Sequence, residues 1–136
     1  MQYRTMEEEI FSTQVKECPL LINSPVVILE NTDTASAAED LLIDFDNVNR
    51  ATIVGTASYG STGQPLFIEF ADGSNVRICT RWCTYPNGKE FINIGVIPHI
   101  HAELTLNDYK NNYDSVLEKG LKVLRDKVSN SLYNVK

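Results

Sequence analysis

The strongest constraint on the fold is a pair of short apolar runs separated by one helix-like segment. Residues 26–29 contain no polar side chain, which is typical of a parallel strand covered on both faces. A second short apolar run covers residues 51–54. Strand, helix and strand in this order predict one βαβ unit, and therefore an α/β fold. The apolar face of the helix repeats at helical spacing through Ala38, Leu41, Leu42 and Phe45.

A β-hairpin and one more strand are predicted in the second half of the chain. Residues 66–70 and 76–82 flank Asp72 and Gly73, a pair that favours a tight turn between antiparallel strands. We expect residues 91–96 to form the further strand, because the chain is apolar there and is closed by a proline.

Helical signals follow near the C-terminus. We expect one helical turn at 106–109, and a last helix opened by Ser115, which has Glu118 three positions later as in a capping box. The start of the chain is mixed and polar. We therefore expect residues 1–24 to be a lead-in segment and residues 25–136 to belong to the folded domain.

Charge and hydropathy exclude two classes of partner. The net charge of −6 argues against a nucleic-acid partner, since such proteins need clustered Lys and Arg. No apolar run reaches the length of a membrane span. The first residues lack the basic start and apolar core of a signal peptide. We expect the parent protein to work outside the cytoplasm, in the periplasm, at the cell surface or secreted, with its signal outside this chain.

The three cysteines indicate neither a disulfide framework nor a metal site. Cys79 and Cys83 lie in a predicted strand, where this spacing separates their Cα atoms by roughly 13 Å. A disulfide needs Cα atoms within about 7 Å, so these two cysteines are not expected to bridge each other. The pairing of Cys18 stays open.

Ser36 stands where the first strand gives way to the helix. A hydroxyl at that junction lies beside free backbone N–H groups, which suits a nucleophile that attacks a carbonyl group. Alternatively, Ser36 only caps the helix, with Glu39 completing a capping box. Residues 32–34 already offer capping side chains, and the small neighbours Ala35 and Ala37 leave the hydroxyl accessible.

The motifs around and after Ser36 favour the nucleophile. Residues 31–40 (Asn-x-x-Thr-Ala-Ser-Ala-Ala-Glu-Asp) resemble the nucleophile segment of the tail-specific, or C-terminal processing, serine peptidases. Residues 54–60 resemble that family's Val-Gly loop, and residues 72–98 resemble its hairpin, its Pro-x-Gly turn and its Gly-Val-x-Pro ending. The resemblance implies that Ser36 is the nucleophile and that the Ala37 N–H is an oxyanion donor.

By the same resemblance, we expect part of a crotonase-like or ClpP-like spiral with a βαβ unit, a hairpin and a C-terminal helix. The expected activity is endoproteolysis of a polypeptide substrate through an acyl-enzyme, without a cofactor. The family's upstream glycine-rich oxyanion segment is absent from this chain. We therefore expect the C-terminal half of a catalytic domain, inactive alone, with self-association possible through the missing parts of the fold.

The small-residue loop departs from the processing peptidases. They carry a lysine base directly after the Tyr-Gly of this loop, where the present chain has Ser61. A serine cannot replace a desolvated lysine as general base. The sequence instead resembles the tricorn-like branch, which uses Ser, His and Glu, and whose histidine would lie upstream. We expect Gly60, Ser61 and Gly63 to line the substrate site.

The acid of that branch falls close to Glu90. The alignment puts the acid at Ile92, and two positions of a strand that are two residues apart share one face, so a small shift or bulge would reconcile them. Glu90 is therefore a candidate catalytic acid. Alternatively, it is an exposed carboxylate beside Lys89.

Two other functions stay open. Because the lysine is missing, a non-catalytic polypeptide-binding or scaffold domain on the same fold is the main alternative. The spacing of His99, His101 and Glu103 in a strand would suit a zinc-dependent hydrolase. A polar strand end accounts equally well for these three residues, and we predict no metal site.

Overall fold

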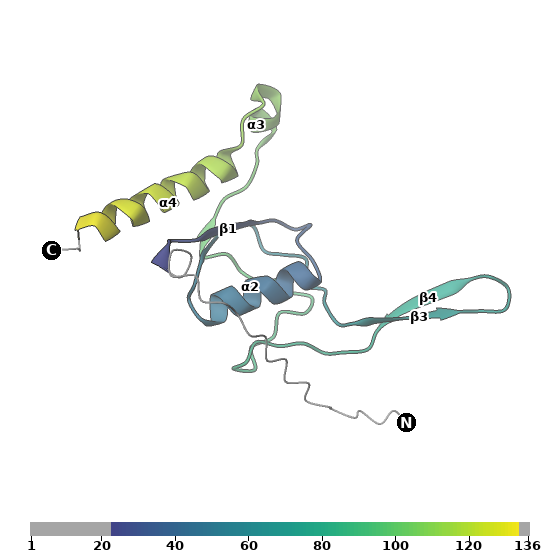
Figure 1. The fold of residues 1–136 in the computed structure, drawn as a ribbon. Coiled ribbons are helices and arrows are strands. Elements are labelled where there is room, and N and C mark those ends of the chain that lie inside the picture. Colours follow the sequence, from purple (N-terminus) through teal and green to yellow (C-terminus); the bar gives the residue numbers. More distant parts are fainter. Residues whose placement is uncertain (1–22, 134–136) are drawn as a thin grey trace.

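The computed structural model describes residues 23–133 (Figure 1). The predicted lead-in segment therefore lies almost entirely outside the described residues, and so does Cys18. Cys79 and Cys83 form no disulfide with each other. The elements, in chain order, are β1 (Val27–Glu30), α2 (Ala37–Asn47), β2 (Thr52–Gly55), β3 (Pro65–Glu69), β4 (Asn75–Cys79), β5 (Ile100–His101), α3 (Leu106–Asn111) and α4 (Ser115–Tyr133).

The predicted βαβ unit is confirmed. Strands β1 and β2 are parallel, with Val27 opposite Thr52, and α2 connects them. A third parallel strand, β5, pairs with the other edge of β2, so the strand order is β1-β2-β5. The sequence suggested a strand here only as one interpretation of the His99 and His101 spacing, because a strand of two residues carries no periodicity of its own.

The prediction of a strand at residues 91–96 is wrong. The N–H groups of Ile94 and Gly95 both donate to the carbonyl oxygen of Phe91, at 3.0 and 2.8 Å, so this segment closes a turn. Asn93 and Gly95 have φ angles of 62° and 88°, which a strand cannot accommodate. Apolar residues recur here because the turn packs into the core.

The hydrophobic core lies between the sheet and α2. Leu42 and Ile43 of α2 are buried in it, whereas Leu41 is 53 % exposed, so the predicted inclusion of Leu41 in the buried face is wrong. The helix instead turns Glu39 inward, and this residue is fully buried. The buried core cluster consists of Leu42, Ile43, Ile53, Tyr85, Phe91 and Val96.

Helix α4 covers the other face of β1 through a close contact at Gly120. A Cβ atom at Gly120 would lie 2.7 Å from Cδ2 of Leu29, so a larger residue would require the Leu29 side chain to shift. Leu29 is nevertheless 40 % exposed, because β1 is an edge strand of the described sheet. The expectation that both faces of this strand are buried is therefore wrong.

The start of α4 also differs from the prediction. The helix begins at Ser115, but its capping side chain is Asp114, whose carboxylate accepts the Leu117 N–H at 2.8 Å. The Ser115 hydroxyl instead donates to the Asp108 carboxylate at 2.9 Å, so a capping box on Ser115 is wrong. None of the helices within residues 23–133 combines the length and apolar character needed to cross a membrane.

The predicted hairpin is confirmed and extends away from the sheet and α2 (Figure 1). Strands β3 and β4 are antiparallel, and Phe67 lies opposite Arg77. The Asp72 carboxylate accepts the N–H and the hydroxyl of Ser74, at 3.0 and 2.7 Å, which closes the turn. The hairpin starts two residues after Gly63, so it grows directly out of the loop that the sequence singled out.

Candidate functional site

Ser36 occupies a strained turn between β1 and α2. Its φ and ψ angles are 60° and −127°, a conformation that residues with a side chain rarely adopt and that costs about 1–3 kcal/mol. Ser36 and Glu39 are placed as in a capping box, but the Ser36 hydroxyl makes no side-chain capping hydrogen bond. The residue is exposed, so a strained backbone presents its hydroxyl to solvent at the start of α2.

Glu39 holds this turn against the loop that follows β2. Its fully buried carboxylate accepts four hydrogen bonds. Three come from the backbone N–H groups of Ser36, Gly60 and Ser61, at 3.1, 2.6 and 2.8 Å. The fourth comes from the Ser58 hydroxyl at 2.5 Å. The sequence indicated Glu39 only as the capping partner of Ser36, because the other donors lie about 20 positions further along the chain.

Ser61 contacts the Ser36 turn through its backbone. Its carbonyl oxygen accepts the Ser36 N–H at 2.8 Å. The adjacent Thr62 hydroxyl donates to the Asp40 carboxylate at 3.2 Å, which ties the loop to α2 a second time. Ser61 therefore lies beside Ser36, and its expected place in the substrate site stays a prediction.

The two predicted loop glycines have different surroundings. Gly60 packs against the 93–95 turn, where a Cβ atom would lie 2.8 Å from the Gly95 nitrogen. The Gly63 carbonyl oxygen accepts the N–H groups of Thr80 and Arg81, at 3.0 and 3.2 Å, at the base of the hairpin. Gly60 is thus held between Glu39 and the 93–95 turn, and Gly63 anchors the hairpin.

The Ala37 N–H is the open donor next to Ser36. The N–H of Ser36 itself is occupied by Ser61 and Glu39. The next one along, that of Ala37, has no backbone acceptor within residues 23–133, whereas the Ala38 N–H donates to the Ala35 carbonyl oxygen at 3.3 Å. An uncommitted N–H at the first turn of a helix favours developing negative charge.

Glu90 is not drawn into these contacts. Its side chain is exposed, and it makes no hydrogen bond or ion pair with any described residue. Glu90 and Ile92 do not share a strand face as predicted, because residues 91–95 form a turn. Ile92 packs against the core cluster. The catalytic role of Glu90 stays a prediction.

His99 is a structural link at the far end of α2. Its Nδ1 accepts the Ile53 N–H at 2.9 Å, and its Nε2 lies 3.0 Å from the Asp46 carboxylate. Asp46 follows Ser36 by ten helical positions, which corresponds to about 15 Å along the axis. Both ring nitrogens are thus engaged far from Ser36. Within residues 23–133, no group of three His, Cys, Asp or Glu residues is placed to hold a metal ion.

Glu30 is a buried acid that the sequence did not single out. It is only 4 % exposed, and neither of its carboxylate oxygens has a hydrogen-bond partner among residues 23–133. Burial, together with the charges of Glu39 and Asp46, raises the pKa of Glu30 to about 8. The Tyr85 hydroxyl donates to Asp46 at 3.0 Å, and burial also raises the pKa of Tyr85. The sequence signal that could have singled out Glu30 is its position as a charged residue directly after an apolar run.

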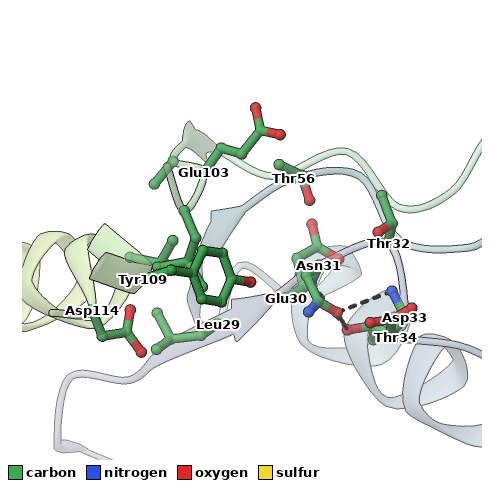
Figure 2. Close-up of a pocket in the computed structure, with 13 residues that line it drawn as sticks. Leu29, Glu30, Asn31, Thr32, Asp33, Thr34, Thr56, Glu103, Tyr109 and Asp114 are labelled. Carbon is green, nitrogen blue, oxygen red and sulfur yellow. Dashed lines mark hydrogen bonds between the residues drawn. The ribbon is translucent and has the colours of Figure 1, made fainter. Parts of the chain in front are cut away.

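A pocket of about 450 Å³ opens beside the segment that leads into Ser36 (Figure 2). Figure 2 shows the 31–34 turn on one side of this pocket and Tyr109 and Asp114 on the other. The Asn31 side chain closes the turn by accepting the Asp33 N–H at 3.0 Å. Ser36 itself does not line this pocket.

A serine on a strained strand-to-helix turn, followed by an open N–H, is the arrangement that serine hydrolases use for a nucleophile. The comparison with protein families defines the class more closely. The model of peptidase family S41 matches residues 1–102, and this chain belongs to that family of serine peptidases.

The chain is similar to complete processing peptidases over most of its length. It is 28 % identical to a carboxy-terminal-processing protease of Bartonella bacilliformis, over 82 % of this chain and 26 % of that protein. It is 27 % identical to the carboxy-terminal processing protease CtpA of Bacillus subtilis, over 98 % and 31 %. The chain thus spans between a quarter and a third of these relatives.

The crystal structure of the tricorn protease has a similar fold. Its TM-score is 0.73, with 16 % identity over 91 % of this chain and 13 % of that one. At this identity the similarity shows the fold alone.

Proposed function

We propose that this chain supplies the nucleophile of a serine endopeptidase that hydrolyses peptide bonds through an acyl-enzyme on Ser36. The observation that carries this proposal is the strained backbone of Ser36, because strain of this kind persists only where surrounding contacts hold it. Those contacts are the Ser61 carbonyl oxygen and the Glu39 carboxylate.

In the proposed reaction, the Ser36 oxygen attacks the substrate carbonyl carbon and its proton passes to a general base. The tetrahedral intermediate expels the amine, which takes up that proton, and leaves an ester on Ser36. Water, deprotonated by the same base, then hydrolyses the ester and restores the hydroxyl. The Ala37 N–H is the donor in this chain that would stabilise the oxyanion.

The general base is proposed to come from outside the described residues. Both nitrogens of His99 are occupied about one helix length from Ser36, and Ser61 stands where the processing peptidases have lysine. A histidine upstream, with Glu90 as its acid partner, is the arrangement that the tricorn-like resemblance suggests.

The activity is proposed for the full-length protein, because this chain spans only part of its relatives. We propose that the remaining sequence completes a crotonase-like or ClpP-like spiral around the nucleophile. Residues 1–136 alone are expected to be inactive, and cleavage of a fluorogenic peptide by this chain alone would contradict that expectation.

A fluorophosphonate probe tests the proposal on the full-length protein. The wild type is expected to be labelled and Ser36→Ala is expected to lose the label, because the probe forms its bond with the activated serine oxygen. Ser74→Ala is the matched control, since Ser74 lies in the hairpin turn, and it should label like the wild type. A wild type that takes no label, while binding polypeptides, would favour the non-catalytic domain.

A further inference from the structure

We propose that Ser58 is a positioning residue of this site, whose hydroxyl fixes the nucleophile turn and the 93–96 segment relative to each other. The inference rests on the proposed function, because positioning has a measurable effect only where Ser36 reacts. It concerns how the described residues hold Ser36 in its reactive geometry.

The Ser58 hydroxyl makes two hydrogen bonds to different segments, one as a donor and one as an acceptor. It donates to the Glu39 carboxylate at 2.5 Å and accepts the Val96 N–H at 2.7 Å. The Ser58 N–H also donates to the Val96 carbonyl oxygen at 3.1 Å. Both residues are buried, and Val96 is fully so, so water does not replace these hydrogen bonds.

The same Glu39 carboxylate accepts the Ser36 N–H at 3.1 Å. A continuous chain of hydrogen bonds therefore runs from Val96 through Ser58 and Glu39 to Ser36. Hydrogen bonds to an ionised acceptor in a buried site are stronger than neutral ones, so this chain can hold a strained turn.

The backbone segments around these hydrogen bonds are closely packed. A Cβ atom at Gly95 would lie 2.2 Å from the Ser58 carbonyl oxygen, and one at Gly60 would lie 2.8 Å from the Gly95 nitrogen. The 58–60 loop and the 93–96 segment therefore touch through bare backbone. Loss of the hydroxyl would leave the Val96 N–H buried without a partner, and the two segments would have to shift together.

A shift of Glu39 would let the Ser36 turn relax toward an unstrained backbone. The Ser36 hydroxyl and the Ala37 N–H would then move away from the geometry needed for attack. A displacement of about 1 Å in a reacting group can cost on the order of 100-fold in rate. Since Ser58 is buried below the surface, it cannot contact the substrate directly.

The test compares full-length wild type with Ser58→Ala and Ser58→Thr, using peptide hydrolysis and the rate of fluorophosphonate labelling. Ser58→Ala should lower kcat and the labelling rate about 10- to 100-fold, with KM changed less than about twofold. Ser58→Thr keeps the hydroxyl and should recover to within about fivefold of the wild type. Circular dichroism confirms that each variant is folded.

Two results would overturn the inference: a folded Ser58→Ala enzyme with wild-type kcat, or a folded Ser58→Thr enzyme as slow as Ser58→Ala. Should Ser58→Ala fail to fold, Ser58→Cys carries the same comparison, because a thiol is a weak hydrogen-bond donor. The labelling separates the two proposals. A wild type without Ser36-dependent label removes the proposed function, whereas normal wild-type labelling with unchanged Ser58→Ala removes only the role of Ser58.

Discussion

Glu30 is expected to make the folded domain less stable as the pH rises. Below its ordinary pKa of 4.5 the carboxyl is protonated in both the folded and the unfolded chain, so its titration does not change the free energy of unfolding there. Above that pH, the unfolded chain releases the proton while the folded chain keeps it until about pH 8. The destabilisation caused by Glu30 therefore grows between these two pKa values and is constant at higher pH.

The size of this effect follows from the two pKa values. At about 1.4 kcal/mol for each pH unit, the interval from 4.5 to about 8 corresponds to roughly 5 kcal/mol as an upper limit. Glu30 lies at the end of an edge strand beside an open pocket, where solvent relaxation weakens the penalty of burial. We therefore expect about 2–3 kcal/mol.

The measurement is urea unfolding of the full-length protein between about pH 5 and about pH 9, with hydrogen exchange of the β2 amides as the local readout. Over this pH range, the free energy of unfolding of Glu30→Gln should fall by the expected 2–3 kcal/mol less than that of the wild type. Slopes are compared because the amide also changes the baseline stability. Glu69→Gln, on the exposed hairpin, should keep the wild-type slope. Parallel curves for the wild type and Glu30→Gln would refute the reasoning.

Three further substitutions, two of them with a matched control, test the packing through the free energy of unfolding of the full-length protein. Gly95→Ala should cost more than about 2 kcal/mol, because its Cβ would lie 2.2 Å from a carbonyl oxygen, whereas Gly73→Ala, in open space, should cost about 1 kcal/mol. Leu42→Ala should cost about 2–5 kcal/mol and the exposed Leu41→Ala less than about 0.5; equal losses would contradict the observed helix face. His99→Ala should cost about 1–3 kcal/mol by leaving a β2 N–H without its acceptor, and chelators should not alter activity.

Much of the architecture could be predicted from local sequence patterns. The βαβ unit followed from two apolar runs on either side of a helical repeat, and the hairpin followed from one Asp-Gly pair. Ser36 could be placed at a strand-to-helix junction for the same reason. These features depend on residues within a few positions of each other, so periodicity and turn chemistry determine them.

Features that depend on distant partners could not be predicted. Residues 91–96 read as a strand because they are apolar, but left-handed backbone at Asn93 and Gly95 turns them into the core. His99 reads as a ligand candidate, and only the tertiary structure places it on the β2 backbone. Local secondary-structure propensity does not predict either contact, because the partners come from elsewhere in the chain.

The sequence by itself determined that a serine stands between a strand and a helix, within motifs of a serine peptidase family. The tertiary structure decided how that serine is held. The strain at Ser36 and the burial of Glu39 exist because donors from the 58–61 loop meet one carboxylate. A buried charge is stable only when such donors surround it, and folding alone brings them together.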